Sequence, residues 1–218
     1  MAEEIIEQGY RELADTILEH NPGVDLGRVR AAFELADRAH SGQKRKAGTP
    51  YVTHCVAAAQ ICAEMGLDED SIVAALLHDC IEDTAITHED IARQFGAEVA
   101  DIVEGVTKLT RVQFTSREDE QMENLRKMLM AMAKDIRVIL IKIADRLHNM
   151  RTMEYMVAQK QLEKSLETME IYAPIAHRLG LQKVKWELED LSLKYLDPDG
   201  YREIITYLDS KADVLNEF

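Results

Sequence analysis

Cysteine is scarce in this sequence. Only Cys55, Cys62 and Cys80 occur among 218 residues, and no pair has C-x-x-C spacing. An odd number of thiols without that spacing argues against a disulfide framework and against a thiolate zinc site. We therefore expect reduced cysteines and a cytoplasmic location.

Long hydrophobic runs are also missing. The longest apolar stretch, residues 136–143, is interrupted by Arg137 and Lys142, and a membrane span needs about 20 apolar residues. The first ten residues lack the basic start and apolar run of a secretory signal. We expect a soluble protein without a membrane partner.

Positive charge is under-represented. Lys and Arg number 26 against 40 Asp and Glu, which gives a formal net charge of −14. Such a balance works against binding to nucleic acid phosphates. A small anionic substrate would need a local cluster of positive charge. The loop at 41–51 offers one in Lys44, Arg45 and Lys46.

Glycine and proline are few, and most of them fall between apolar segments. The sequence has 10 Gly and 4 Pro, and 46% of its residues are hydrophobic. Apolar residues recur every three or four positions, which predicts an all-α protein of about ten helices. Thr87 and Ser116 each precede an aspartate by three residues, as in a capping box. We expect helices at about 3–19, 25–40, 53–65, 70–83, 87–95, 97–109, 116–132, 135–153, 161–179, 182–195 and 199–215.

Two histidines and two aspartates form a candidate metal site, although they lie on three separate predicted helices. They are His54, His78, Asp79 and Asp145. A lone histidine near an apolar helix is usually an ordinary core residue. Burying Asp79 and Asp145 among Ala, Leu and Ile is costly unless each charge is paired or bound to a metal. Imidazole with carboxylate suits Mn, Fe, Zn or Co and leaves positions for water and substrate.

Further polar residues follow these candidates at helical spacing. Glu82 and Asp83 would face the same pocket if the helix persists, and they could orient a water or take its proton. A solvated helix end is the alternative. His148, Asn149 and Thr152 follow Asp145 at three, four and seven residues and form a polar stripe. This stripe could contact a base or sugar, but the residues alone slightly favour a solvated face.

Several longer segments resemble the hydrolase domain of the RelA/SpoT homologues, bacterial enzymes that make and degrade the alarmones ppGpp and pppGpp. The resemblance covers nearly all of the chain from about residue 25 and implies an HD-domain helical bundle. The segments are GQKRKAGTPYVTH, AALLHDCIEDT, FGAEVADIVEGVTKL, AMAKDIRVILIKIADRLHNMRTM and IYAPIAHRLGLQKVKWELEDLSLKYLDP.

The resemblance implies Mn²⁺-dependent removal of the 3′-pyrophosphate of ppGpp or pppGpp, leaving GDP or GTP. It implies that Glu82 and Asp83 activate or position the attacking water. Ala47, Cys55 and Cys80 depart from the family, which often has Ser, Pro and Val there. The implied metal ligands are His54, His78, Asp79 and Asp145, and the implied nucleotide contacts are Arg45, Lys46, Asn149 and Thr152, to which we add His148 from the polar stripe.

The resemblance also implies a domain organisation. We expect a hydrolase domain over residues 1–160 and, over 161–218, helices like those that connect hydrolase to synthetase, with a synthetase domain as partner in a longer chain. Two alternatives stay open. One is another HD-family nucleotide phosphohydrolase, and the other is a non-catalytic module that binds alarmone and regulates a neighbouring domain.

Overall fold

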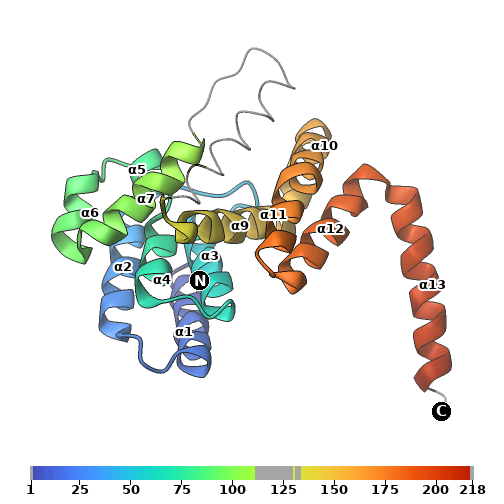
Figure 1. The fold of residues 1–218 in the computed structure, drawn as a ribbon, viewed down its shortest axis with the longest axis horizontal. Coiled ribbons are helices and arrows are strands. Elements are labelled where there is room, and N and C mark those ends of the chain that lie inside the picture. Colours follow the sequence, from blue (N-terminus) through green and yellow to red (C-terminus); the bar gives the residue numbers. More distant parts are fainter. Residues whose placement is uncertain (1, 111–129, 131–133, 217–218) are drawn as a thin grey trace. The chain divides into compact units, whose positions relative to one another are not determined.

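The computed structural model describes residues 2–110, 130 and 134–216 (Figure 1). Within these ranges the chain is all-α, and the only β-type pairing described is an isolated bridge between Lys44 and Pro50. The prediction of an all-α protein is thereby confirmed. The chain divides into two compact units, Met1–His148 and Asn149–Phe218. The predicted functional division near residue 160 stays a prediction.

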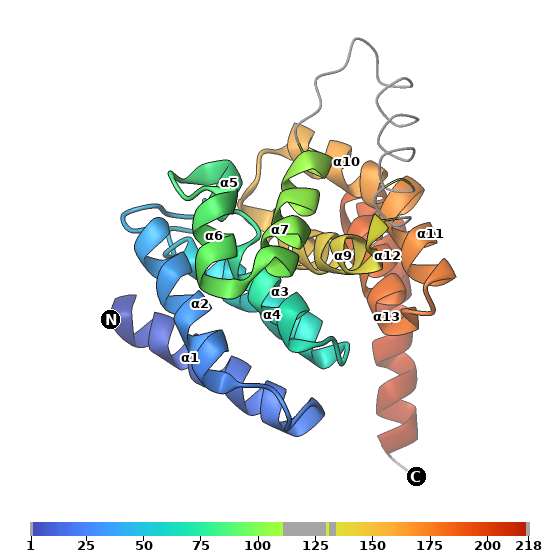
Figure 2. The same cartoon turned by 60° about the vertical axis from the view of Figure 1, so that its left-hand side comes forward.

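The first unit is built around two buried helices, α3 and α4. Helices α1 and α4 pack on α3, and helices α2 and α7 pack on α4 (Figure 2). Every residue of the segment 71–78 is buried, and each large apolar side chain removed from water stabilises the fold by about 1.5–3 kcal/mol. The helices are α1 (Ala2–His20), α2 (Leu26–Ala39), α3 (Val52–Glu64), α4 (Glu69–Leu77), α5 (Cys80–Asp83), α6 (His88–Phe95), α7 (Ala97–Thr110) and α9 (Ile136–Arg151), whose last residues belong to the second unit.

Helix ends in the first unit follow the local chemistry of the sequence. Asp25 caps α2 by accepting a hydrogen bond from the Gly27 amide, as predicted. Thr87 and Asp90 form both bonds of the predicted capping box. Gly66, with φ +72°, follows α3 where the sequence predicts a stop. The predicted helix at 116–132, with its capping box at Ser116, lies almost entirely outside the described residues.

Helix α9 begins at a charged cluster and then enters the core. The Arg137 guanidinium contacts Asp135 and Glu98 at 2.6 Å each and Asp68 at 3.2 Å. These contacts connect the start of α9 to α7 and to the residue that caps α4. Further along α9, residues 141–147 are all buried, as the sequence predicts.

One predicted helix is interrupted at two of the predicted metal ligands, His78 and Asp79. The helix expected at 70–83 ends at Leu77, His78 and Asp79 form a turn, and α5 follows at Cys80. The His78 Nδ1 lies 2.8 Å from the Ala75 carbonyl, which is one of the last carbonyls of α4. A side chain that takes such a carbonyl helps to end a helix.

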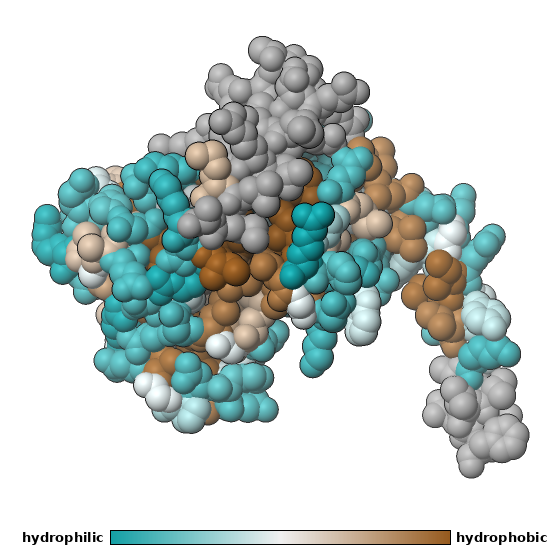
Figure 3. All heavy atoms as spheres, in the orientation of Figure 1, coloured by the Kyte–Doolittle hydropathy of each residue, from teal (hydrophilic) through white to brown (hydrophobic). Residues whose placement is uncertain are grey.

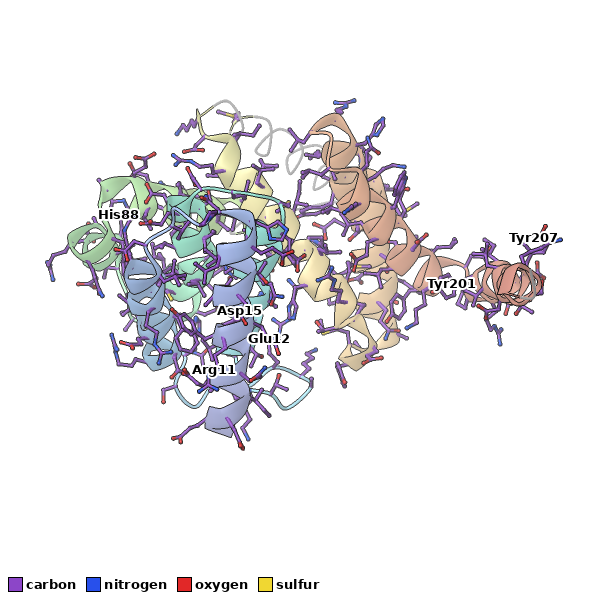
Figure 4. The ribbon with its side chains drawn as sticks, turned by 90° about the horizontal axis from the view of Figure 1, so that it is seen from below. Arg11, Glu12, Asp15, His88, Tyr201 and Tyr207 are labelled. Carbon is purple, nitrogen blue, oxygen red and sulfur yellow. The ribbon has the colours of Figure 1, made fainter. Side chains whose placement is uncertain are left out.

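The second unit is a smaller set of helices in which α12 contacts α10, α11 and α13. Helix α13 carries Tyr201 and Tyr207 (Figure 4). None of the described helices is both long enough and apolar enough to cross a bilayer. The elements are η1 (Met153–Tyr155), α10 (Ala158–Glu167), η2 (Thr168–Tyr172), α11 (Ala173–Arg178), α12 (Gln182–Leu196) and α13 (Pro198–Asn216).

The single helix predicted at 161–179 is wrong in detail. The helical segment starts earlier, at Ala158, and η2 within it is π-helical, with the Ala173 amide bonded to the Thr168 carbonyl. Pro174 explains the widened turn. Proline has no N–H to donate, and its ring clashes with the carbonyl four residues earlier, here that of Glu170.

Candidate metal centre

The structure brings the four predicted ligands together from distant parts of the first unit. His54 lies in α3, His78 and Asp79 in the turn between α4 and α5, and Asp145 in α9. The His54 Nε2 lies 3.2 Å from Asp145 Oδ1 and 3.6 Å from Asp79 Oδ2. The His78 Nε2 lies 3.1 Å from Asp79 Oδ2 and 3.9 Å from Asp145 Oδ1. Each imidazole therefore faces both carboxylates through its Nε2.

The arrangement of these atoms fits a divalent metal ion. Ligand atoms of His54, His78 and Asp145 all lie within 4.8 Å of one another, and the three residues are buried. The His78 Nε2 is buried and makes no hydrogen bond of standard geometry within the described structure, although Asp79 Oδ2 lies 3.1 Å away. A buried nitrogen without a well-aligned partner is costly. The His78 Nδ1 lies against the Ala75 carbonyl. Nε2 is therefore the ring nitrogen of His78 that can bind a metal.

The buried charged groups of the site shift one another's pKa values. Burial disfavours charge on His78, yet Asp79 and Asp145 outweigh burial and raise the pKa of His78 to about 9. Burial lowers the pKa of His54, which keeps that ring in the neutral form that ligates metals. Burial opposes ionisation of Asp145, but Lys142 and the two histidines hold its pKa well below the usual range. With His78 charged, the carboxylates of Asp79 and Asp145 are balanced by His78 and Lys142, and a divalent ion bound at the His78 Nε2 would replace its proton.

Three of the ligands have a side-chain partner that fixes their orientation. The His54 Nδ1 lies 2.6 Å from the His148 Nδ1. Lys142 donates to Asp145 Oδ2 at 2.7 Å, and both side chains are buried. Tyr51 donates to Asp79 Oδ2 at 2.8 Å. Such partners set the orientation and basicity of metal ligands.

Lys142 and Tyr51 were not among the predicted site residues. Lys142 precedes Asp145 by three residues, and Tyr51 precedes His54 by three. Residues at this spacing lie on one face of a helix, and a lysine within an apolar run is expensive to bury alone. This spacing was the available signal for Lys142. Nothing local indicated that the Tyr51 hydroxyl would reach Asp79, 28 residues away.

Glu82 and Asp83, the acidic pair, lie on the short helix α5, which follows the turn formed by His78 and Asp79. The Asp83 Oδ2 lies 3.1 Å from the Tyr51 hydroxyl, and the Asp83 side chain is exposed. Glu82 is half-buried. The helix does not persist through His78 and Asp79 as the prediction assumed, but the pair stays within four residues of a candidate ligand. The roles of Glu82 and Asp83 remain predictions.

The basic loop folds back on itself before α3. The Arg45 amide donates to the Thr49 carbonyl at 2.9 Å, and the Gly48 amide donates to the Arg45 carbonyl at 2.9 Å. Gly48 has φ +85°, a backbone conformation that favours glycine. The Arg45 guanidinium carbon lies 5.5 Å from the centre of the Tyr51 ring, whereas Lys46 is exposed. Contact of Arg45 and Lys46 with a nucleotide remains a prediction.

The predicted polar stripe is divided between the two units. His148 ends the first unit and contacts His54. Asn149 and Thr152 belong to the second unit and are half-buried, and the Thr152 hydroxyl donates to the Asn149 carbonyl at 3.4 Å. Nucleotide binding by these three residues stays a prediction.

The cysteines that depart from the family pattern lie inside the first unit. Cys55 and Cys80 are fully buried, and burial raises the pKa of both thiols, that of Cys80 to about 12. Buried, protonated thiols behave as small apolar packing groups. All three cysteines are free rather than disulfide-bonded.

Comparison with known proteins connects this site to a family. The family model described as HD domain matches residues 32–182. A Synechocystis protein named probable guanosine-3′,5′-bis(diphosphate) 3′-pyrophosphohydrolase is 53% identical over 173 residues, 79% of this chain and 23% of that protein. The bifunctional (p)ppGpp synthase/hydrolase SpoT of Escherichia coli K12 is 49% identical over 195 residues, 89% of this chain and 28% of SpoT.

Other relatives carry a different name. A Mycobacterium leprae protein named probable GTP pyrophosphokinase is 51% identical over 194 residues, 89% of this chain and 24% of that protein. Among solved structures, a metazoan ortholog of SpoT described as hydrolysing ppGpp is 34% identical with a TM-score of 0.49, over 58% of this chain and 70% of its own. The chain spans about a quarter of the length of its curated relatives. It belongs to the HD domain family and is a homologue of the SpoT and RelA enzymes.

Proposed function

We propose that this chain hydrolyses ppGpp and pppGpp to GDP or GTP and pyrophosphate, with Mn²⁺ as its metal. The observation that carries the proposal is the convergence of His54, His78 and Asp145, with Asp79 beside them, around the buried Nε2 of His78. The relatives are named both hydrolases and pyrophosphokinases. The HD domain match favours the hydrolase.

The chain's own residues divide the work of this reaction. His54, His78, Asp79 and Asp145 would hold the ion. When bound, a divalent ion acidifies water and polarises a phosphoryl oxygen. Glu82 and Asp83 would orient the attacking water and accept its proton, because carboxylates at the edge of such a site act as general bases. Lys142 would keep Asp145 ionised and turned so that Oδ1 faces both histidines.

Because the protein is acidic overall, the attraction for an anionic nucleotide must come from positive charges close to the site. The net charge of −14 opposes approach of ppGpp at long range. Arg45 would stack its planar guanidinium on the guanine, and Lys46 would meet phosphate charge. We propose that His148, Asn149 and Thr152 contribute the remaining polar contacts to base and sugar.

The proposal is tested by mixing the purified chain with ppGpp and Mn²⁺ and identifying the products. GDP plus pyrophosphate is expected. Release of single phosphates would indicate another HD nucleotide phosphohydrolase, and binding without turnover would indicate a non-catalytic alarmone-binding module. His78→Gln should abolish release of pyrophosphate, whereas His88→Gln, which removes a half-buried imidazole paired with Asp101, should not.

The metal is tested separately. Crystals soaked in MnCl₂ should show anomalous scattering between the imidazole nitrogens of His54 and His78. The absence of an anomalous peak at that position would contradict the proposal. The synthetase partner, the connector role of residues 161–218 and a cytoplasmic location are further proposals, which concern the longer chain of the relatives.

A further inference from the structure

Tyr51 joins parts of the site that the proposed function treats separately. It stands directly before α3, three residues ahead of the ligand His54, and its amide donates to the Gln43 carbonyl at 3.1 Å. Its side chain contacts a metal ligand, one residue of the acidic pair and the basic loop. All of these contacts lie within the first unit.

The hydroxyl lies between two carboxylates. It is 2.8 Å from Asp79 Oδ2 and 3.1 Å from Asp83 Oδ2. A phenol has one proton to donate, so the two carboxylates share or compete for it.

The ring of Tyr51 is held in place by the side chains of His40 and Arg45. The His40 ring stacks on it with centroids 4.6 Å apart and an interplanar angle of 22°. His40 is itself buried, with Nδ1 2.9 Å from Gln43 Oε1. Gln43 in turn donates to the Asp83 carbonyl at 3.1 Å. Arg45 lies against the same ring, with its guanidinium carbon 5.5 Å from the ring centre.

We propose that Tyr51 is a positioning residue that couples Asp79 and Asp83 to the nucleotide-facing Arg45. This role rests on the proposed function, because it concerns the metal, the water and the nucleotide of that reaction. The hydroxyl orients Asp79 so that its carboxylate stays aimed at the histidines, and it holds Asp83 next to that ligand. The ring gives Arg45 a flat support at a fixed place relative to the metal ligands.

The two halves of the side chain can be tested separately. Tyr51→Phe keeps the ring and removes the hydroxyl, and Tyr51→Leu removes both. Loss of an outer partner of a metal ligand typically costs 10–100-fold in metal affinity or activity. We expect Tyr51→Phe to weaken Mn²⁺ binding and lower kcat by about this factor while KM for ppGpp changes little. Tyr51→Leu should raise KM as well, because Arg45 loses its support.

Metal affinity is measured without turnover, from the rise in melting temperature as Mn²⁺ is titrated into the metal-free protein. Tyr10→Phe is the matched control, since its hydroxyl bonds the Leu26 carbonyl at 3.3 Å in the same unit. This control should match wild type in Mn²⁺ affinity, kcat and KM. Far-UV circular dichroism checks that each variant is folded.

The outcomes separate the coupling role from the proposed function. If wild type binds Mn²⁺ and releases pyrophosphate but Tyr51→Phe matches it in metal affinity and kcat, the coupling role is wrong and the proposed function stands. If Tyr51→Phe is unfolded, a Tyr51→Leu variant that folds with wild-type KM would overturn the role of the ring. A wild-type chain that neither binds Mn²⁺ nor releases pyrophosphate would overturn both.

Discussion

The two units differ in the polar side chains that they bury. In the first unit the buried polar groups include His54, His78, Lys142 and Asp145, which meet from α3, the turn after α4, and α9. Among the described residues of the second unit they are the small hydroxyl side chains of Ser165, Thr168 and Ser192. Thr168 donates to the Lys164 carbonyl at 2.6 Å and Ser192 to the Leu188 carbonyl at 2.7 Å, each one turn back on its own helix.

This difference indicates in which unit buried polar side chains serve more than packing. A hydroxyl bonded within its own helix costs little to bury. Charged and ligating groups that are desolvated together are expensive unless something compensates them. Such groups converge in the first unit, and this is the physical reason why the proposed metal site is placed there.

The second unit also leaves more apolar surface uncovered. Helix α13 exposes Ile204, Tyr207 and Leu208, with Tyr207 62% exposed, and Figure 3 shows apolar side chains on this helix. Trp186 of α12 is 58% exposed. In the first unit the helices close around α3 and α4. The second unit therefore has a smaller core for its size.

The largest expected effect comes from removing a ligand. Asp145→Ala and Asp79→Ala should each lose bound Mn²⁺ and lose ppGpp hydrolysis together. Asp145→Ala also leaves Lys142 buried without that carboxylate, which should destabilise the fold by about 3–5 kcal/mol. Metal content by mass spectrometry, activity and denaturant melts measure the three effects. Full metal occupancy in either variant would show that the buried aspartates of the first unit are not metal ligands.

The next effect separates metal binding from water activation. Glu82→Gln should keep Mn²⁺ and reduce turnover by about 10²–10⁴-fold, which is the usual contribution of a general base. Metal content and kcat are measured on the same preparation. An empty metal site in this variant would instead make Glu82 a ligand.

A packing effect of intermediate size is expected where α7 and α9 approach each other. A Cβ on Gly105 would lie 2.8 Å from the Val138 Cγ2. Gly105→Ala should therefore destabilise the first unit by about 1–3 kcal/mol through overpacking. Adding Val138→Ala should relieve the clash. A double variant no more stable than Gly105→Ala would contradict this explanation.

The pH dependence of metal binding gives a smaller, graded effect. In the metal-free protein the pKa of His78 is raised from 6.5 to about 9. The stability gained from the charged ring is fully present below about pH 6.5 and is lost as the pH rises through 9. A metal ion must displace this proton, so Mn²⁺ affinity should rise by up to about tenfold per pH unit between pH 7 and 8.5. Calorimetric titrations that show a flat profile would contradict the raised pKa.

The smallest effect is expected in the second unit. Ser192→Ala removes a hydroxyl whose bond stays within its own helix, and alanine has the better helix propensity. We expect a change in unfolding free energy of less than about 1 kcal/mol and no change in metal affinity. A loss of several kcal/mol would show that buried hydroxyls in this unit matter as much as the charged groups of the first.

Much of the fold could be predicted because it depends on local chemistry. The capping box at Thr87 and Asp90 and the cap at Asp25 need only neighbouring residues to form. The interruption at His78 was missed, because the apolar pattern of α4 continues to its last residue and the competing bond to Ala75 depends on a side-chain rotamer. The π-helical turn before Pro174 was missed because the prediction did not use that proline.

Periodicity and the cost of burying charge act residue by residue, so the sequence predicts a helical chain and singles out His54, His78, Asp79 and Asp145 as candidate metal ligands. That both imidazoles face the same carboxylates, and that Tyr51 lies between Asp79 and Asp83, became visible only in the folded chain. The reason is geometric. Contacts between α3, α5 and α9 depend on how helices far apart in the sequence approach one another, and no local pattern records that approach.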